Sequence, residues 1–234
     1  MSPEHKTGCL ICGEDLEYTD ESTQLECFYC KQKFESNTKC KNGHYICDQC
    51  HSAPAVDLIQ NYCITSNSED PLELALTLLR NPNVKMHGPE HHFLVPAVLL
   101  AAYYNIKGDQ KAKATKIRMA KKRASQILGG FCGFYGDCGA AVGTGIFVSL
   151  ITEANPLSKQ EWRLANLSTA KTLLSIAEHG GPRCCKRNTF LAIEQATKFV
   201  KDNFGVTFKL NKDIKCEFFP LNKECLQESC PFHP

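Results

Sequence analysis

The chain has 234 residues, of which 43% are hydrophobic and 22% charged, and its formal net charge is +2. This composition is typical of an ordinary soluble globular protein, and the length allows one large domain or a small module plus a core domain. The small net charge gives no argument for nucleic-acid binding. The longest apolar run, residues 93–104, is too short to span a bilayer.

Cysteine is the unusual residue of the chain, with 15 copies. The count is odd, and the first residues are polar and charged, unlike a signal peptide. We therefore expect reduced thiols that bind metal in the cytoplasm, where disulfides are rare, and no membrane attachment.

The first fifty residues contain closely spaced metal-ligand residues. Eight ligands are the number that two tetrahedral zinc ions require, and four protein ligands per ion leave no open position for chemistry. Residues 1–52 are thus predicted to form a double-zinc module with a structural role. The ligands are Cys9, Cys12, Cys27, Cys30, Cys40, His44, Cys47 and Cys50.

Two pairings of these ligands are possible. In a sequential arrangement, the residues up to Cys30 hold one ion and those from Cys40 hold the other. In a cross-brace, Cys9 and Cys12 share an ion with Cys40 and His44, and the remaining four cysteines share the second. The run from Cys40 to Cys50 is short for closing its own tetrahedron, and it looks like the middle of a RING finger, which favours the cross-brace. The order of the other pairs differs from a RING.

Beyond the module, the pattern predicts a mainly α protein. Residues 53–70 are predicted to form a helix and a linker that ends at an N-cap, Asp70, before Pro71. Residues 71–234 are predicted to form a helical domain rich in cysteine and histidine, with a possible capping box at Ser158 and Glu161. Alternation at residues 206–210 predicts a strand. The expected helices cover residues 72–79, 89–104, 109–128, 139–154, 158–177 and 182–204.

Three turns in the helical domain share one plan, in which glycine or proline and a thiol or imidazole precede a helix. They are residues 87–92 (HGPEHH), 129–139 (GGFCGFYGDCG) and 179–187 (HGGPRCCKR). A helix N-terminus carries a partial positive charge and unpaired N–H groups, so a cysteine there has a lowered pKa. Asp137 is the expected N-cap of the helix after the second turn.

If these turns converge, they form a thiolate-rich site suited to an iron–sulfur cluster, zinc or another thiophilic metal. We predict Cys132, Cys138 and one of Cys184 and Cys185 as ligands or nucleophile. His87 and His91 are predicted as ligands or general acid/base, and Arg183 and Lys186 as groups that hold an anionic substrate. The alternative for any single cysteine is an inert core thiol. For the glycines between residues 139 and 145, close helix–helix packing is favoured over a cofactor loop.

Two further segments contain candidate ligands. Residues 110–136 lack acidic side chains and hold seven basic ones, which predicts either a solvated face or an anion surface for RNA, a nucleotide or an acidic partner protein. The tail contains Cys216, Cys225, Cys230 and His233, which could close a third metal site or complete the site of the helical domain.

The run from Cys40 to His51, the HGPEHH and GFCGFYGDCG segments and the CPFH tail together resemble an uncharacterised cysteine-rich domain family of anaerobic archaea and bacteria. In that family the domain is sometimes fused to S-adenosylmethionine-dependent methyltransferases, which implies a methyltransferase as a possible partner. The sequence favours a metalloprotein acting in redox, sulfur or one-carbon chemistry. The alternative is a non-catalytic zinc-finger adaptor that binds a protein or RNA.

Overall fold

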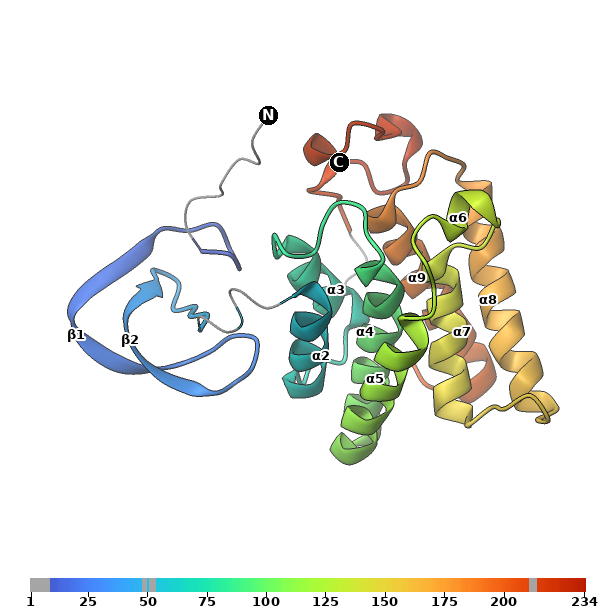
Figure 1. Cartoon of the computed structure of the whole chain (residues 1–234), viewed down its shortest axis with the longest axis horizontal. Helices are drawn as coiled ribbons and strands as arrows, with labels where there is room; N and C mark the ends of the chain where they lie inside the picture. Colours follow the sequence, from blue (N-terminus) through green and yellow to red (C-terminus); the bar gives the residue numbers. More distant parts are fainter. Residues whose placement is uncertain (1–8, 48–49, 51–53, 211–213) are drawn as a thin grey trace.

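The computed structural model describes residues 9–47, 50, 54–210 and 214–234. The polar N-terminus and the predicted module boundary at residue 52 lie outside these residues. The described chain is mainly helical, as predicted. One small sheet comes before the helices in the chain (Figure 1).

The N-terminal module is built on two antiparallel strands, β1 (Leu16–Glu26) and β2 (Lys33–Cys40). The register pairs Leu16 with Cys40 at one end of the hairpin and Glu26 with Lys33 at the other, with an irregularity between Tyr18 and Thr23. Because most of β1 is exposed, burial on this sheet contributes little to the stability of the module.

The helical body contains eight α-helices, and two short 3-10 helices follow in the tail. In chain order they are α2 (Ala55–Thr65), α3 (Pro71–Arg80), α4 (Glu90–Lys107), α5 (Gln110–Ala124), α6 (Phe131–Phe134), α7 (Gly139–Thr152), α8 (Gln160–Glu178), α9 (Cys185–Phe204), η1 (Phe219–Leu221) and η2 (Gln227–Ser229).

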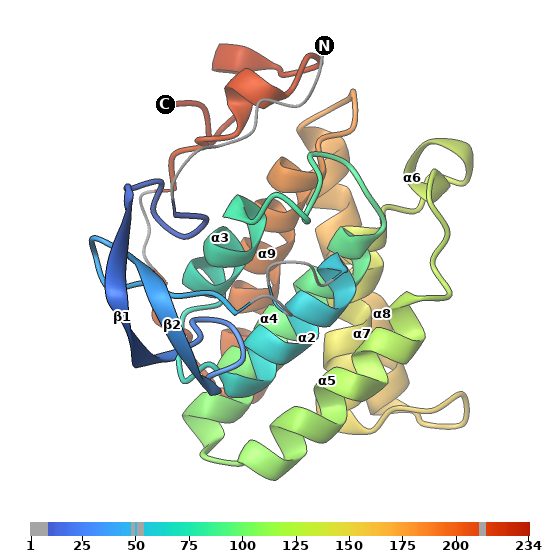
Figure 2. The ribbon, with the colours of Figure 1, turned by 60° about the vertical axis from the view of Figure 1, so that its left-hand side comes forward.

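Helix α4 is the central element of the body. It is apolar on almost every side, as expected for a helix that is surrounded by others. It contacts α2, α3, α5, α7 and α9, whereas α8 packs on the outside against α7 and α9 (Figure 2). The core of the body therefore forms around α4.

The glycines of α7 allow close helix packing, as predicted. A side chain at Gly139 would meet the His92 ring, and one at Gly143 would meet Pro96 and Val95, all on α4. A side chain at Gly145 would meet Thr169 on α8. The small residues thus bring α7 close to two neighbours, α4 and α8.

Local capping differs from the prediction at two helices. Asp70 caps α3 as predicted, because its carboxylate accepts the Leu72 and Glu73 amides. The predicted capping box of α8 is wrong: Ser158 Oγ accepts the Asn155 amide at 3.0 Å, and Lys159 occupies the N-cap position. The N-cap of α7 is Cys138 and not Asp137.

The predicted strand at residues 206–210 is also wrong. Val206 and Phe208 are buried and alternate with exposed residues, but the segment pairs with no strand in the described part of the chain. An extended segment becomes a strand only when a neighbour accepts its backbone hydrogen bonds.

The module and the helical body share one apolar core. Tyr29 is fully buried, its hydroxyl lies 3.0 Å from Asn81 Nδ2, and its carbonyl accepts the Thr65 hydroxyl at 2.8 Å. Phe28 stacks on Tyr62 of α2. These contacts fix one end of the hairpin on α2 and α3. In the described residues, no helix has both the length and the apolar character that crossing a bilayer needs.

Candidate metal centres and thiol cleft

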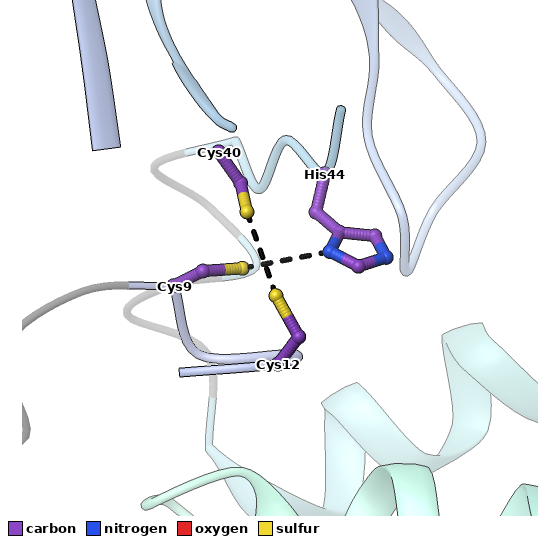
Figure 3. A group of neighbouring side chains, drawn as sticks. All are labelled: Cys9, Cys12, Cys40 and His44. Atoms are coloured by element: carbon purple, nitrogen blue, oxygen red, sulfur yellow. Dashed lines mark hydrogen bonds between the residues drawn. The ribbon is translucent and has the colours of Figure 1, made fainter. Parts of the chain in front are cut away.

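The first candidate metal centre lies at the open end of the β1–β2 hairpin. Cys9, Cys12, Cys40 and His44 place their ligand atoms within 4.8 Å of one another (Figure 3). Cys12 Sγ lies 3.5 Å from Cys40 Sγ, and Cys9 Sγ lies 3.8 Å from His44 Nδ1. Two ligands that are each about 2.3 Å from a tetrahedral zinc lie about 3.8 Å apart, so this geometry fits one such ion.

The second candidate centre lies at the turn of the hairpin, beside α2. It consists of Cys27, Cys30, Cys47 and Cys50, whose sulfurs also lie within 4.8 Å of one another. Cys30 Sγ and Cys47 Sγ are 3.9 Å apart. Three of these cysteines are buried, and the Tyr29 ring between Cys27 and Cys30 enters the shared core.

The pairing in the structure is therefore the cross-brace. The strand register explains it, because Leu16 lies opposite Cys40 and brings the segment before β1 to the end of β2. The Phe28 amide donates to the Tyr45 carbonyl at 2.8 Å, which brings the Cys47 segment to the hairpin turn.

Backbone amides prepare several of these sulfurs for metal binding. The Ile11 amide donates to Cys9 Sγ at 3.4 Å, Asn42 to Cys40 Sγ at 3.3 Å and Cys47 to Cys27 Sγ at 3.4 Å. Hydrogen bonds of this kind favour the thiolate, which is the form that binds metal. Each group provides four protein ligands, so an ion bound there has no position left for a substrate.

Three helix N-termini, those of α4, α7 and α9, converge at one end of the helical body. Gly139 at the start of α7 lies against the His92 ring in the first turn of α4. Asn188 Nδ2 on α9 lies 3.4 Å from Cys138 Sγ at the start of α7. The three turns singled out in the sequence thus meet in space.

A cleft of about 600 Å³ opens between the second and third turns. Cys132 and Cys138 line it from the second turn, and Arg183 lines it from the third. Apolar residues of α8, among them Leu173 and Ile176, form another wall. The cleft therefore combines thiols, an exposed guanidinium and an apolar surface.

Arg187 and Asn188 also line the cleft, and sequence reasoning did not select them. Arg187 is buried, and its guanidinium donates to the Gly180 carbonyl at 2.7 Å and to the Pro182 carbonyl at 3.1 Å. It holds the third turn against α9. The sequence feature that could have identified Arg187 is a second arginine, after Arg183, in the first turn of α9.

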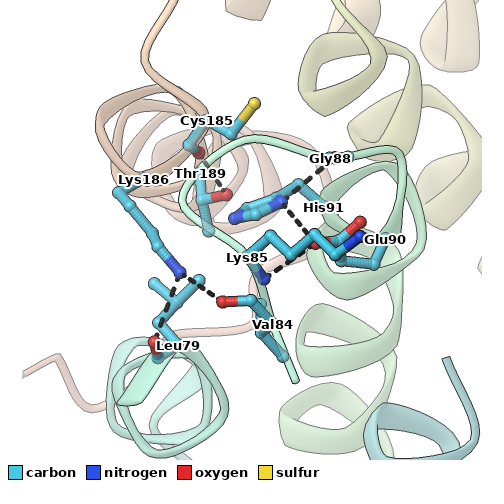
Figure 4. Close-up of polar contacts among 9 residues, drawn as sticks. All are labelled: Leu79, Val84, Lys85, Gly88, Glu90, His91, Cys185, Lys186 and Thr189. Carbon is cyan, nitrogen blue, oxygen red and sulfur yellow. Dashed lines mark hydrogen bonds and ion pairs between the residues drawn. The ribbon is translucent and has the colours of Figure 1, made fainter. Parts of the chain in front are cut away.

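Lys186 does not fit its predicted role in holding a substrate. Its side chain is buried, and Nζ donates to the Leu79 carbonyl at 3.2 Å and the Val84 carbonyl at 3.1 Å (Figure 4). Burial lowers the pKa of Lys186 to about 8. This cation connects α9 to the end of α3 and to the segment after it, and it does not line the cleft.

The two predicted histidines lie beside α9 and the tail, away from the cleft lining. His91 is 1% exposed, and its Nδ1 lies 3.1 Å from the Gly88 carbonyl. Burial lowers its pKa to about 3, so the ring is neutral at pH 7. His87 Nε2 lies 3.2 Å from Asn222 Oδ1 in the tail.

The two adjacent cysteines of the third turn point to different places. Cys184 is the N-cap of α9, where its sulfur accepts the Arg187 amide at 3.4 Å. It lies with Cys216, Cys225 and Cys230 around a small cavity under the tail. Burial raises the pKa of Cys184 and raises that of Cys185 to about 11, contrary to the lowered pKa expected at a helix N-terminus.

Several basic side chains of helix α5 bind other groups of the protein. Lys113 is buried and donates to the Ser66 carbonyl, Lys116 pairs with Glu153, and Lys121 pairs with Asp57. These contacts leave less free charge for an anion surface than the sequence indicated.

The fold and the two four-ligand groups define a mainly helical, cysteine-rich protein with candidate metal centres in an N-terminal module. The chain belongs to DUF5714, a family of unknown function, whose model matches residues 59–233. The matched region begins within α2, so it covers most of the helical body and the tail. Neither the comparison with curated proteins nor that with solved structures gives a match.

Proposed function

We propose that the protein is a cytoplasmic zinc protein whose helical domain performs thiol-dependent redox, sulfur or one-carbon chemistry in the cleft. The observation that supports this proposal is the meeting of the second and third turns, before α7 and α9, which places Cys132, Cys138 and Arg183 around one cleft. The two zinc ions of the N-terminal module have a structural role.

Each cleft residue has a defined task in this proposal. Cys138 acts as nucleophile or metal ligand at the N-cap of α7, where Asn188 Nδ2 lies 3.4 Å from its sulfur. Cys132 is the second thiol, available for a redox couple or for a shared thiophilic metal. Arg183, exposed at the rim, binds an acidic group of the substrate.

Alkylation kinetics test the cleft. Iodoacetate is anionic and iodoacetamide is neutral, and mass spectrometry measures the labelling of Cys132 and Cys138 by each. We expect Arg183→Ala to slow iodoacetate several-fold while changing the iodoacetamide rate little. Lys159→Ala, a charge removal at the N-cap of α8, is the control and leaves both rates unchanged. Equal slowing of both reagents by Arg183→Ala contradicts an anion site.

Metal analysis of protein purified without oxygen tests the form of the site. Absorbance near 400 nm supports an iron–sulfur cluster at the cleft thiols Cys132 and Cys138, as iron–sulfur centres absorb there. Colourless protein that contains zinc alone argues against a cluster. Full metal content and stability in the Cys132→Ser, Cys138→Ser double variant would exclude a shared metal at these thiols.

The second candidate is a non-catalytic adaptor, which the saturated four-ligand groups favour. In this case the module and exposed basic residues of α5, such as Arg118 and Lys122, bind a protein partner or RNA, and a methyltransferase is one candidate partner. Unchanged partner or RNA binding in the Cys138→Ser variant, together with loss of binding in Arg118→Glu, would favour the adaptor.

A further inference from the structure

The C-terminal tail folds with little regular structure. Its described part, residues 214–234, contains only the short 3-10 helices η1 and η2. Even so, the chain returns on itself, because the Cys216 amide donates to the Phe232 carbonyl at 2.6 Å. Phe232 is buried with its ring 5.2 Å from that of Phe190 on α9. A segment with so few backbone pairs needs another source of order.

Four thiols surround a small cavity where this tail meets α9. Cys184 lines it from the N-cap of α9, and Cys216, Cys225 and Cys230 line it from the tail. All four are half-buried and reduced. The cavity has a volume of about 20 Å³. A volume of about 10–15 Å³ holds a single water, so this space suits one ion and is too small for a cluster.

Backbone amides approach these sulfurs as they do in the N-terminal groups. The Gln227 amide donates to Cys225 Sγ at 3.4 Å, two residues along the chain, which repeats the geometry of Ile11 and Cys9. The Arg187 amide donates to Cys184 Sγ at the same distance. The turn that holds Cys225 thus has the local form of the N-terminal metal-binding turns, and Cys184 accepts the Arg187 amide as the N-cap of α9.

The surrounding charges fit an anionic centre. A zinc ion with four thiolates has a net charge of 2−, and burying it requires nearby cations. Lys186 and Arg187 lie two and three residues after Cys184, and both are buried. Lys186 Nζ donates to carbonyl oxygens and lies 5.0 Å from the centre of the Phe218 ring in the tail. These two cations would compensate the charge.

We propose that Cys184, Cys216, Cys225 and Cys230 form a third zinc site, which fastens the tail to the start of α9. This inference does not depend on the chemistry proposed for the cleft. In this site Cys184 takes the place of the predicted ligand His233, which also lines the cavity but whose Nε2 lies 3.0 Å from Gln227 Oε1. Among the described residues, only the N-terminal groups have all their ligand atoms within 4.8 Å of one another. The four thiols of the third site are farther apart, so in this proposal zinc binding draws them together.

The test is metal analysis and ¹¹³Cd NMR of the full chain, purified without oxygen and exchanged with cadmium. We expect three ions per chain and three resonances, two from sites with four sulfurs and one from the site with three sulfurs and His44. Two resonances would exclude the third site. One four-sulfur resonance and two with nitrogen would assign His233 as the ligand and overturn the role of Cys184.

Matched variants locate the site. Cys184→Ser and Cys225→Ser are expected to lose one four-sulfur resonance and one zinc ion per chain. Cys185→Ser changes the adjacent thiol, which does not line the cavity, and is expected to keep all three ions, as is His233→Ala. Three retained ions in Cys184→Ser, or the loss of one in His233→Ala, would contradict the assignment. The native spectrum decides the question if a variant does not fold.

Discussion

His91 shows how strongly burial can change a titratable residue. The sequence placed it at a turn before a helix, which made it a candidate acid, base or ligand. The structure buries the ring against α9, where loss of water and the nearby Lys186 charge lower its pKa to about 3. No pattern of neighbours in the sequence could reveal this burial, because it depends on residues from a distant helix.

This shift makes the stability of the protein depend on pH. The unfolded chain protonates His91 near its ordinary pKa of about 6.5, whereas the folded chain resists protonation until about pH 3. The stability that the protein gains from keeping His91 neutral is therefore complete above pH 6.5 and is lost as the pH falls towards 3. Between pH 6.5 and 5.5, this one group should lower the free energy of unfolding by about 1 kcal/mol.

His91→Gln removes the titration and keeps a polar side chain. We expect the difference in the free energy of unfolding between the native protein and this variant to shrink by about 1 kcal/mol over that interval. Denaturant titrations at each pH measure it. Metal loss at low pH affects both proteins, so the comparison cancels it. Parallel pH profiles would contradict a shifted pKa.

At the scale of elements, α7 lies so close to α4 that glycine is required at Gly143. Alanine usually stabilises a helix by about 1 kcal/mol relative to glycine. At Gly143, however, the new methyl group would lie 2.9 Å from Pro96 Cδ and 3.3 Å from the His92 carbonyl oxygen. Overpacking of this kind costs about 1–3 kcal/mol, so the steric cost should exceed the gain.

Gly143→Ala is therefore expected to lower the free energy of unfolding, by about 1 kcal/mol after the helix gain is subtracted. Gly133→Ala is the matched control, because a methyl group there meets no atom within 4 Å. It should leave stability unchanged or raise it slightly. Thermal unfolding of both variants measures the contrast. A Gly143→Ala protein as stable as the control would show that α4 and α7 can separate without cost.

The helices could be predicted from local periodicity, and the errors arose where a residue had a non-local choice. The apolar run that forms α4 could be identified as a helix because a buried helix is apolar on all sides. Ser158 could cap α8 or accept the Asn155 amide, and the sequence does not decide between them. Residues 206–210 alternate between buried and exposed side chains, as in a strand. A strand also needs a hydrogen-bonded neighbour, and the sequence pattern does not show whether one is present.

At the scale of the whole molecule, the eight N-terminal ligands could be identified from spacing, but their pairing required the hairpin register. The same limit applied to the tail, where Cys184 and Cys216 are separated by the whole of α9. Sequence proximity suggested His233 as the fourth ligand of a tail site. The chain's path over α9 also brings Cys184 to the cavity that the three tail cysteines and His233 line.

Tyr29 connects the two parts of the molecule. It lies between Cys27 and Cys30 of the second metal group, and its side chain is buried against Tyr62 and hydrogen-bonded to Asn81. Tyr29→Ala should lower the free energy of unfolding by about 3–5 kcal/mol, since it removes a large buried ring. The metal group positions that ring, so loss of the metal should destabilise the helical body through the same contact.

A double-mutant cycle tests this coupling. Tyr29→Ala and Cys30→Ser are expected to be less than additive, because each disrupts the same attachment of the module to α2 and α3. Tyr29→Ala and Cys12→Ser should be closer to additive, since Cys12 is an exposed ligand of the first group. Unfolding of the helical body, followed by far-UV circular dichroism, measures each corner. Full additivity of the first pair would mean that the second metal group folds only its own module.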